Sequence, residues 1–67
     1  MRKIIIVTPT YNEELNISNF ILEVEKIMFS ISVDYEHLII DNSSTDKTQL
    51  IIKEIAKKKK ILKQYLI

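Results

Sequence analysis

The chain has 67 residues, with no glycine, no cysteine, one proline and a net charge of +1. This length allows one small domain, which buries only about 60% of the surface of its unfolded chain and normally needs a disulfide, a structural metal or a partner. The composition excludes disulfides and Cys/His zinc sites and the glycine-rich phosphate loops, and the near-neutral charge gives no reason to expect nucleic-acid binding.

The first predicted element is a β-strand from Lys3 to Thr8, ended by Pro9. The apolar run Ile4–Val7 is continuous rather than alternating, which is typical of a strand buried on both faces of a parallel sheet. The run is too short to span a membrane. It is also interrupted too early for a signal peptide, so we expect a cytoplasmic protein.

An amphipathic helix is predicted to follow, from about Glu14 to Met28. Asn12 is a candidate N-cap, and Glu13 and Glu14 would complement the positive end of the helix. Apolar residues recur at steps of three and four, as on the buried face of a helix. They are Ile17, Phe20, Ile21, Val24, Ile27 and Met28.

A second buried strand is predicted for residues 37–40, ending at Asp41, and the polar residues 42–45 have the chemistry of a turn. A second helix should begin at Asp46, with Gln49 completing a capping box. The predicted apolar face of this helix consists of Leu50, Ile51, Ile55 and Ala56.

The order of these elements predicts an α/β fold made of βαβ units, with a parallel sheet and right-handed crossovers. The tail from Ile61 to Ile67 is either a third strand or a frayed helix end. We interpret His37 as a half-exposed residue at a strand start and Lys57–Lys60 as a solvated helix end. An exposed edge of so small a sheet favours a partner chain that covers it.

Ligands of open α/β sheets bind beyond the carboxyl ends of the strands. Here that rule selects residues 8–14, after the first strand, and residues 41–46, after the second. Both segments are rich in hydroxyl, amide and carboxylate groups, and they are neighbours if the two strands pair. The sequence therefore predicts a binding site between them.

The same two regions carry a resemblance to a known family. Val7–Glu14 and, after the predicted helix, Leu38–Thr48 resemble the amino-terminal part of family 2 glycosyltransferases. The nearest likeness is to polyprenyl-phosphate sugar transferases and bacterial polysaccharide-assembly enzymes, and it covers roughly residues 3–57. It implies that residues 1–67 form one incomplete, Rossmann-like domain of the GT-A type that binds a nucleotide-diphosphate sugar.

The resemblance also implies which residues contact the nucleotide. Pro9, Tyr11 and Glu13 would line the nucleoside pocket, with Tyr11 stacked on the base and Glu13 accepting hydrogen bonds from ribose or base. Asp41 would accept a hydrogen bond from a base imino group. The family often has a second aspartate or a glycine after this position, and Asn42 here is given no ligand role.

In the family, the acidic motif that binds Mg²⁺ or Mn²⁺ and the catalytic base both lie beyond the position of residue 67. We therefore assign no catalytic or metal-binding residue and no cofactor within this chain.

Two interpretations of the chain stay open. It is part of a transferase whose parent catalyses sugar transfer, or it is a non-catalytic remnant or small binding module. A truncation, for instance by a frameshift in the A-rich codons of Lys57–Lys60, is a further hypothesis. A receiver-type flavodoxin-like domain is disfavoured, because Glu13 and Glu14 follow the first strand too late.

Overall fold

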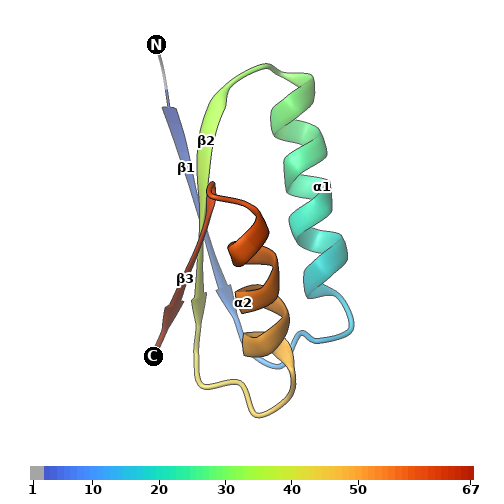
Figure 1. Cartoon of the computed structure of the whole chain (residues 1–67), viewed down its shortest axis with the longest axis vertical. Helices are drawn as coiled ribbons and strands as arrows, with labels where there is room; N and C mark the ends of the chain where they lie inside the picture. Colours follow the sequence, from blue (N-terminus) through green and yellow to red (C-terminus); the bar gives the residue numbers. More distant parts are fainter. Residues whose placement is uncertain (1–2) are drawn as a thin grey trace.

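A computed structural model describes residues 3–67 as a three-stranded parallel sheet with two helices (Figure 1). The elements in chain order are β1 (Lys3–Thr10), α1 (Ile17–Ser30), β2 (Asp34–Asp41), α2 (Thr48–Lys58) and β3 (Leu62–Leu66). The strand order is β1-β2-β3, and both strand pairs are parallel. The predicted α/β fold is thus confirmed as a partial Rossmann-like unit, and the tail is a third strand.

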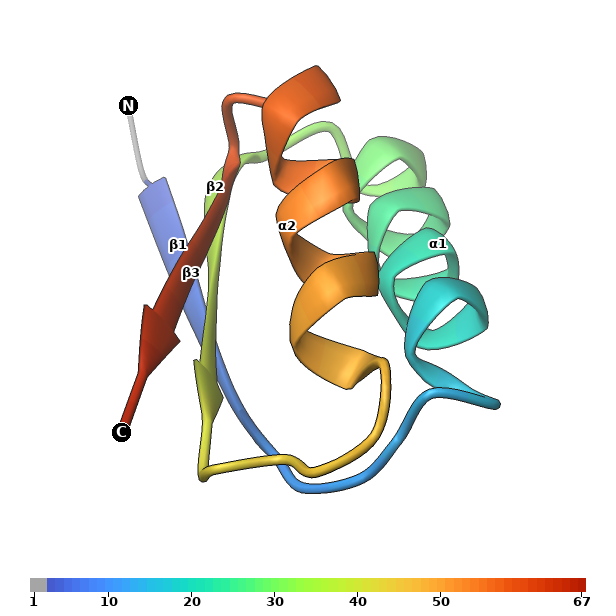
Figure 2. The same cartoon turned by 60° about the horizontal axis from the view of Figure 1, so that its bottom comes forward.

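Both helices lie on the same face of the sheet (Figure 2), so the prediction that the first strand is buried on both faces is wrong for the described residues. The side chains of Ile5 and Val7 on the opposite face are 56% and 54% exposed. Pro9 does not end β1 but pairs with Ile40 inside it. Its missing N–H is tolerated because β1 pairs with a strand on one side only. That a partner chain covers the exposed edge of the sheet stays a prediction.

The helices begin later than predicted, at Ile17 and Thr48. On α1, Ile17 and Ile21 are buried, whereas Phe20 and Ile27 are largely exposed. On α2, the predicted contribution of Leu50 to the apolar face is wrong because its side chain is 56% exposed. Among residues 3–67, neither helix combines the length and the apolar character needed to cross a membrane.

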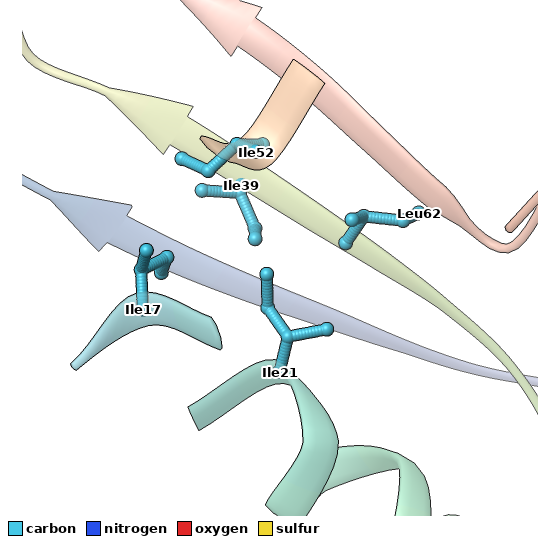
Figure 3. Close-up of a cluster of buried hydrophobic side chains, with 5 residues drawn as sticks. All are labelled: Ile17, Ile21, Ile39, Ile52 and Leu62. Atoms are coloured by element: carbon cyan, nitrogen blue, oxygen red, sulfur yellow. The ribbon is translucent and has the colours of Figure 1, made fainter. Parts of the chain in front are cut away.

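The hydrophobic core lies between the sheet and the two helices (Figure 3). Ile39 at the centre of β2 is fully buried, and so is Ile52 of α2, which the sequence-based prediction missed. Partly buried apolar side chains of α2 pack against this cluster, and they include three of the residues predicted for its apolar face. The buried cluster consists of Ile17, Ile21, Ile39, Ile52 and Leu62.

The lysine run at the end of α2 is not uniformly solvated. Lys59 forms an ion pair with Glu25 of α1, with its Nζ 2.5 Å from the carboxylate oxygen. This contact joins the residue that follows α2 to the carboxyl-terminal half of α1. At the other end of the helices, the loops after β1 and β2 carry the polar residues of the candidate site.

Candidate functional site

The loops after β1 and β2 lie together at the carboxyl edge of the sheet, where the blue and yellow segments meet in Figure 2. Asn12 connects them. Its side-chain Oδ1 accepts a hydrogen bond from the backbone N–H of Thr45 at 2.8 Å, and its own backbone N–H donates to the hydroxyl of Ser44 at 2.9 Å. Asn12 has a φ of +50°, a conformation that asparagine tolerates better than most residues. Its predicted role as a helix cap is therefore wrong.

The amino terminus of α2 holds the loop after β1 from the other side. The buried Thr48 hydroxyl accepts the backbone N–H of Glu13 at 2.8 Å and donates to Asp46. The Asp46 carboxylate accepts the N–H groups of Thr48 at 2.9 Å and of Glu14 at 3.2 Å. Burial alone would raise the pKa of Asp46, but these hydrogen bonds outweigh it and lower the pKa. Asp46 thus accepts the first N–H of α2, but the N-cap position is Lys47, so the predicted helix start and capping box at Asp46 are wrong.

Asp41 ends β2 with a carboxylate that is completely buried. Oδ1 accepts the hydroxyls of Thr10 at 2.7 Å and Ser44 at 2.6 Å. Oδ2 accepts the Ser44 backbone N–H at 2.8 Å and the Gln49 amide at 2.9 Å. Gln49 is therefore engaged by Asp41 and does not complete the predicted capping box. Burial alone would raise the pKa of Asp41, but the bonds from Ser44, Thr10 and Gln49 together hold it below its ordinary value.

A pocket of about 190 Å³ lies beside the end of β1, between that strand and the start of α1. Its walls include Pro9 and Glu13, two of the four predicted nucleotide-binding residues. The lining residues are Thr8, Pro9, Thr10, Glu13, Asn16, Ile17 and Phe20. Tyr11 is not among them: it stands in the same loop with 57% of its surface exposed. Asp41 does not line the pocket either; it is connected to the pocket wall by the hydrogen bond that it accepts from the Thr10 hydroxyl.

Two wider hollows, of about 410 and 470 Å³, lie at the amino ends of the strands. They share Val33, Asp34, Tyr35 and Ile61 as walls. Neither contains a predicted site residue, and both are at the opposite end of the sheet from the loops that α/β proteins use for ligands. The pocket beside β1 is therefore the better candidate site.

His37 was predicted to be half-exposed, and this is wrong. It is 2% exposed, its Nε2 lies 2.8 Å from the Thr8 hydroxyl, and its ring meets the edge of Phe20 with centroids 5.9 Å apart. Burial lowers the pKa of His37. The alternation of side chains along a strand was the available signal, because His37, Ile39 and Asp41 share one face of β2.

The carboxylates of residues 3–67 do not suit a divalent cation. Within residues 3–67 there is no group of three or more histidine, cysteine, aspartate or glutamate side chains able to hold a metal ion. Asp41 and Asp46 already accept hydrogen bonds on both of their oxygens. The Mg²⁺ or Mn²⁺ implied by the resemblance therefore does not fit these residues.

The fold and the site together define a parallel α/β unit whose polar loops and pocket lie at the carboxyl edge of the sheet. A sequence model of the family described as glycosyl transferase family 2 matches residues 5–65. Because this match covers nearly the whole chain, the protein belongs to glycosyl transferase family 2. The pocket between β1 and α1 and the hydrogen-bonded loop after β2 lie within the matched region.

Proposed function

We propose that residues 3–67 supply the nucleoside-binding part of a glycosyltransferase that uses a nucleotide-diphosphate sugar as donor. Membership of the family supports the reaction class. The observation that carries the binding role is the pocket at the carboxyl edge of the sheet, to which Pro9 and Glu13 both contribute. The likeness of Val7–Glu14 and Leu38–Thr48 to polysaccharide-assembly enzymes supports a cytoplasmic role in polysaccharide biosynthesis.

Each of the four residues has a distinct role in this proposal. Pro9 provides a rigid apolar wall, and the Glu13 carboxylate accepts hydrogen bonds from ribose hydroxyls or base N–H groups. The exposed Tyr11 ring closes over the base by stacking. Asp41 acts through Thr10, whose hydroxyl it holds at the pocket wall. A direct contact of Asp41 with the base requires one of its present donors to move aside.

We assign no cation to residues 3–67, because the side chains there do not form a suitable set of ligands, and the resemblance places the base that activates the acceptor outside them. When bound, a divalent cation would neutralise the diphosphate of the donor. The contribution that we propose for this chain is binding and orientation of the nucleoside. Binding without sugar transfer is therefore the expected behaviour of these residues alone.

Calorimetric titration with UDP, GDP and their sugars, with and without Mn²⁺, tests this proposal. We expect metal-independent binding of one nucleotide with a Kd of about 1 mM, a free energy of about −4 kcal/mol. Glu13→Gln should weaken binding by about tenfold, because a hydrogen bond to a charged acceptor becomes one to a neutral amide.

Glu14→Gln is the matched control. The neighbouring Glu14 is exposed and does not line the pocket, so its substitution should leave the affinity within a factor of two. The absence of binding by any nucleotide, or equal losses in the two variants, would contradict the proposal.

A further inference from the structure

A buried histidine underlies the candidate pocket and has no role in the function proposed above. Two lining residues, Thr8 and Phe20, contact the ring of His37 from β1 and α1. The Thr8 hydroxyl is 2.8 Å from Nε2, which is a normal hydrogen-bond distance. Any change in the protonation of the ring therefore acts directly on a group in the pocket wall.

The other polar side chains around the pocket are mainly acceptors. The Glu13 carboxylate only accepts, and Thr10, whose hydroxyl hydrogen goes to Asp41, is left to accept as well. The third, Asn16, has an amide that can both donate and accept.

The Thr8 hydroxyl differs, because its single hydrogen points either to His37 or away from it. When Nε2 carries no hydrogen, Thr8 donates to the ring and is left with lone pairs for a ligand. When Nε2 carries a hydrogen, the ring donates and the hydroxyl hydrogen of Thr8 is released.

We propose that His37, through Thr8, sets the hydrogen-bond polarity of the nucleoside pocket. The neutral ring accepts from Thr8 at Nε2 and leaves the Thr8 oxygen, like those of Thr10 and Glu13, as an acceptor for the O–H groups of ribose or the N–H edge of a base. Protonation of the ring turns the Thr8 hydroxyl hydrogen toward the ligand, so that a donor group of the ligand at this position loses its acceptor. This inference rests on the proposed nucleoside binding and makes His37 a positioning residue that does not touch the ligand.

Burial, rather than neighbouring charge, favours the neutral form of the ring. It lowers the pKa of His37. Glu13 lies across the pocket, and the charges on the elements packed against the ring do not add to the shift. Those charged residues are Lys3 on β1, Glu23, Glu25 and Lys26 on α1, and Lys63 on β3. The switch from acceptor to donor therefore occurs below the ordinary histidine pKa of about 6.5.

Nucleotide titrations of the full chain between pH 8 and pH 5 test the inference. The affinity of the unsubstituted chain should fall by about two- to tenfold as the pH decreases, the range expected for the loss of one hydrogen bond. In Thr8→Val the valine side chain has nearly the shape of threonine but no hydroxyl. This variant should bind the nucleotide more weakly at pH 8, and its affinity should show no such decrease. Thr8→Ser restores the hydroxyl and should restore the pH dependence.

The Thr8→Val variant retains His37, so any general loss of stability at low pH is common to both chains. Unfolding curves recorded at each pH correct for it. The ¹⁵N shifts of the His37 ring provide a second measurement that needs no ligand: at pH 8 they should show hydrogen on Nδ1 and none on Nε2.

An Nε2–H tautomer at pH 8, or an undiminished pH dependence in Thr8→Val, would overturn the inference while leaving nucleoside binding intact. A complete lack of nucleotide binding by the unsubstituted chain would overturn both proposals.

Discussion

The loops after β1 and β2 are similar in composition, but they differ in whether their polar side chains form hydrogen bonds within the protein. After β2, the carboxylates of Asp41 and Asp46 each accept hydrogen bonds on both oxygens, within a network that includes Ser44 and Thr48. After β1, Tyr11 and the side chain of Glu13 remain exposed beside a pocket. The loop after β2 holds the site in place, and the loop after β1 carries the groups free to bind a ligand.

This difference separates two roles that share the same residue types. A buried carboxylate that accepts four hydrogen bonds stabilises a fold, because its removal leaves those donors without their partner. An exposed carboxylate beside an apolar pocket contributes little to stability and is available for a ligand. Substitutions in the two loops should therefore separate stability from affinity.

Asp41→Ala should have the largest effect on stability. It leaves the Thr10 and Ser44 hydroxyls and the Gln49 amide without their acceptor, which we expect to cost about 2–4 kcal/mol. A chain of this size has a total stability of only about 3–10 kcal/mol, so the substitution should remove a large share of it and clearly lower the urea midpoint. Urea unfolding followed by circular dichroism measures the loss.

Asp34→Ala is the matched control for that substitution. Asp34 begins the same strand, and its side chain is exposed, so its removal should change the free energy of unfolding by less than about 0.5 kcal/mol. Similar unfolding midpoints for the two variants would show that the hydrogen bonds of Asp41 do not hold the loop.

Acid should reproduce part of the effect of Asp41→Ala without a substitution. The folded-state pKa of Asp41 is below its unfolded value, so the unfolded chain binds more protons as the pH falls. The stability from this group is complete above about pH 4 and is lost below it, toward the folded-state pKa. His37 adds an earlier and separate loss below about pH 6.5, because its folded-state pKa is also lowered.

Urea unfolding of the unsubstituted chain and of Asp41→Asn, each between pH 7 and pH 3, distinguishes the two groups. The amide variant should show a smaller decrease below pH 4, where Asp46 still contributes, and keep the one below pH 6.5. A decrease below pH 4 of equal size in both chains would assign the acid response to other carboxylates.

The fold was predictable from the sequence because its periodicities are local. The continuous run of β1 and the three- and four-residue steps of α1 indicated the elements correctly. The error on α2 was avoidable, since Ile52 lies three residues before Ile55 and so fits its helical stripe, whereas Leu50 lies five residues before it. The later start of α2 was not predictable in this way, because Asp46 and Thr48 contact the loop after β1 through residues more than 30 positions away.

Non-local contacts explain the errors at the site as well. Asn12 has the chemistry of a helix cap, but Thr45 competes for its side chain through a contact that no sequence window contains. His37 was misplaced because it was treated as the start of its strand, whereas β2 begins three residues earlier and places the ring in the strand interior. The nucleotide-binding roles of Pro9, Tyr11, Glu13 and Asp41 stay predictions.

Tyr11→Ala should have the smallest effect on stability and a clear effect on affinity. Its ring is 57% exposed, so its loss should change the free energy of unfolding by less than about 0.5 kcal/mol. If the ring stacks on the base, nucleotide affinity should fall by about tenfold, a typical effect of removing one stacking partner. Tyr65→Ala on β3, where the side chain is 54% exposed, should leave affinity unchanged. Equal affinities for Tyr11→Ala and Tyr65→Ala would remove the aromatic contact from the proposed site. A loss of stability in Tyr11→Ala would show that side chains of the loop after β1 also hold that loop in place.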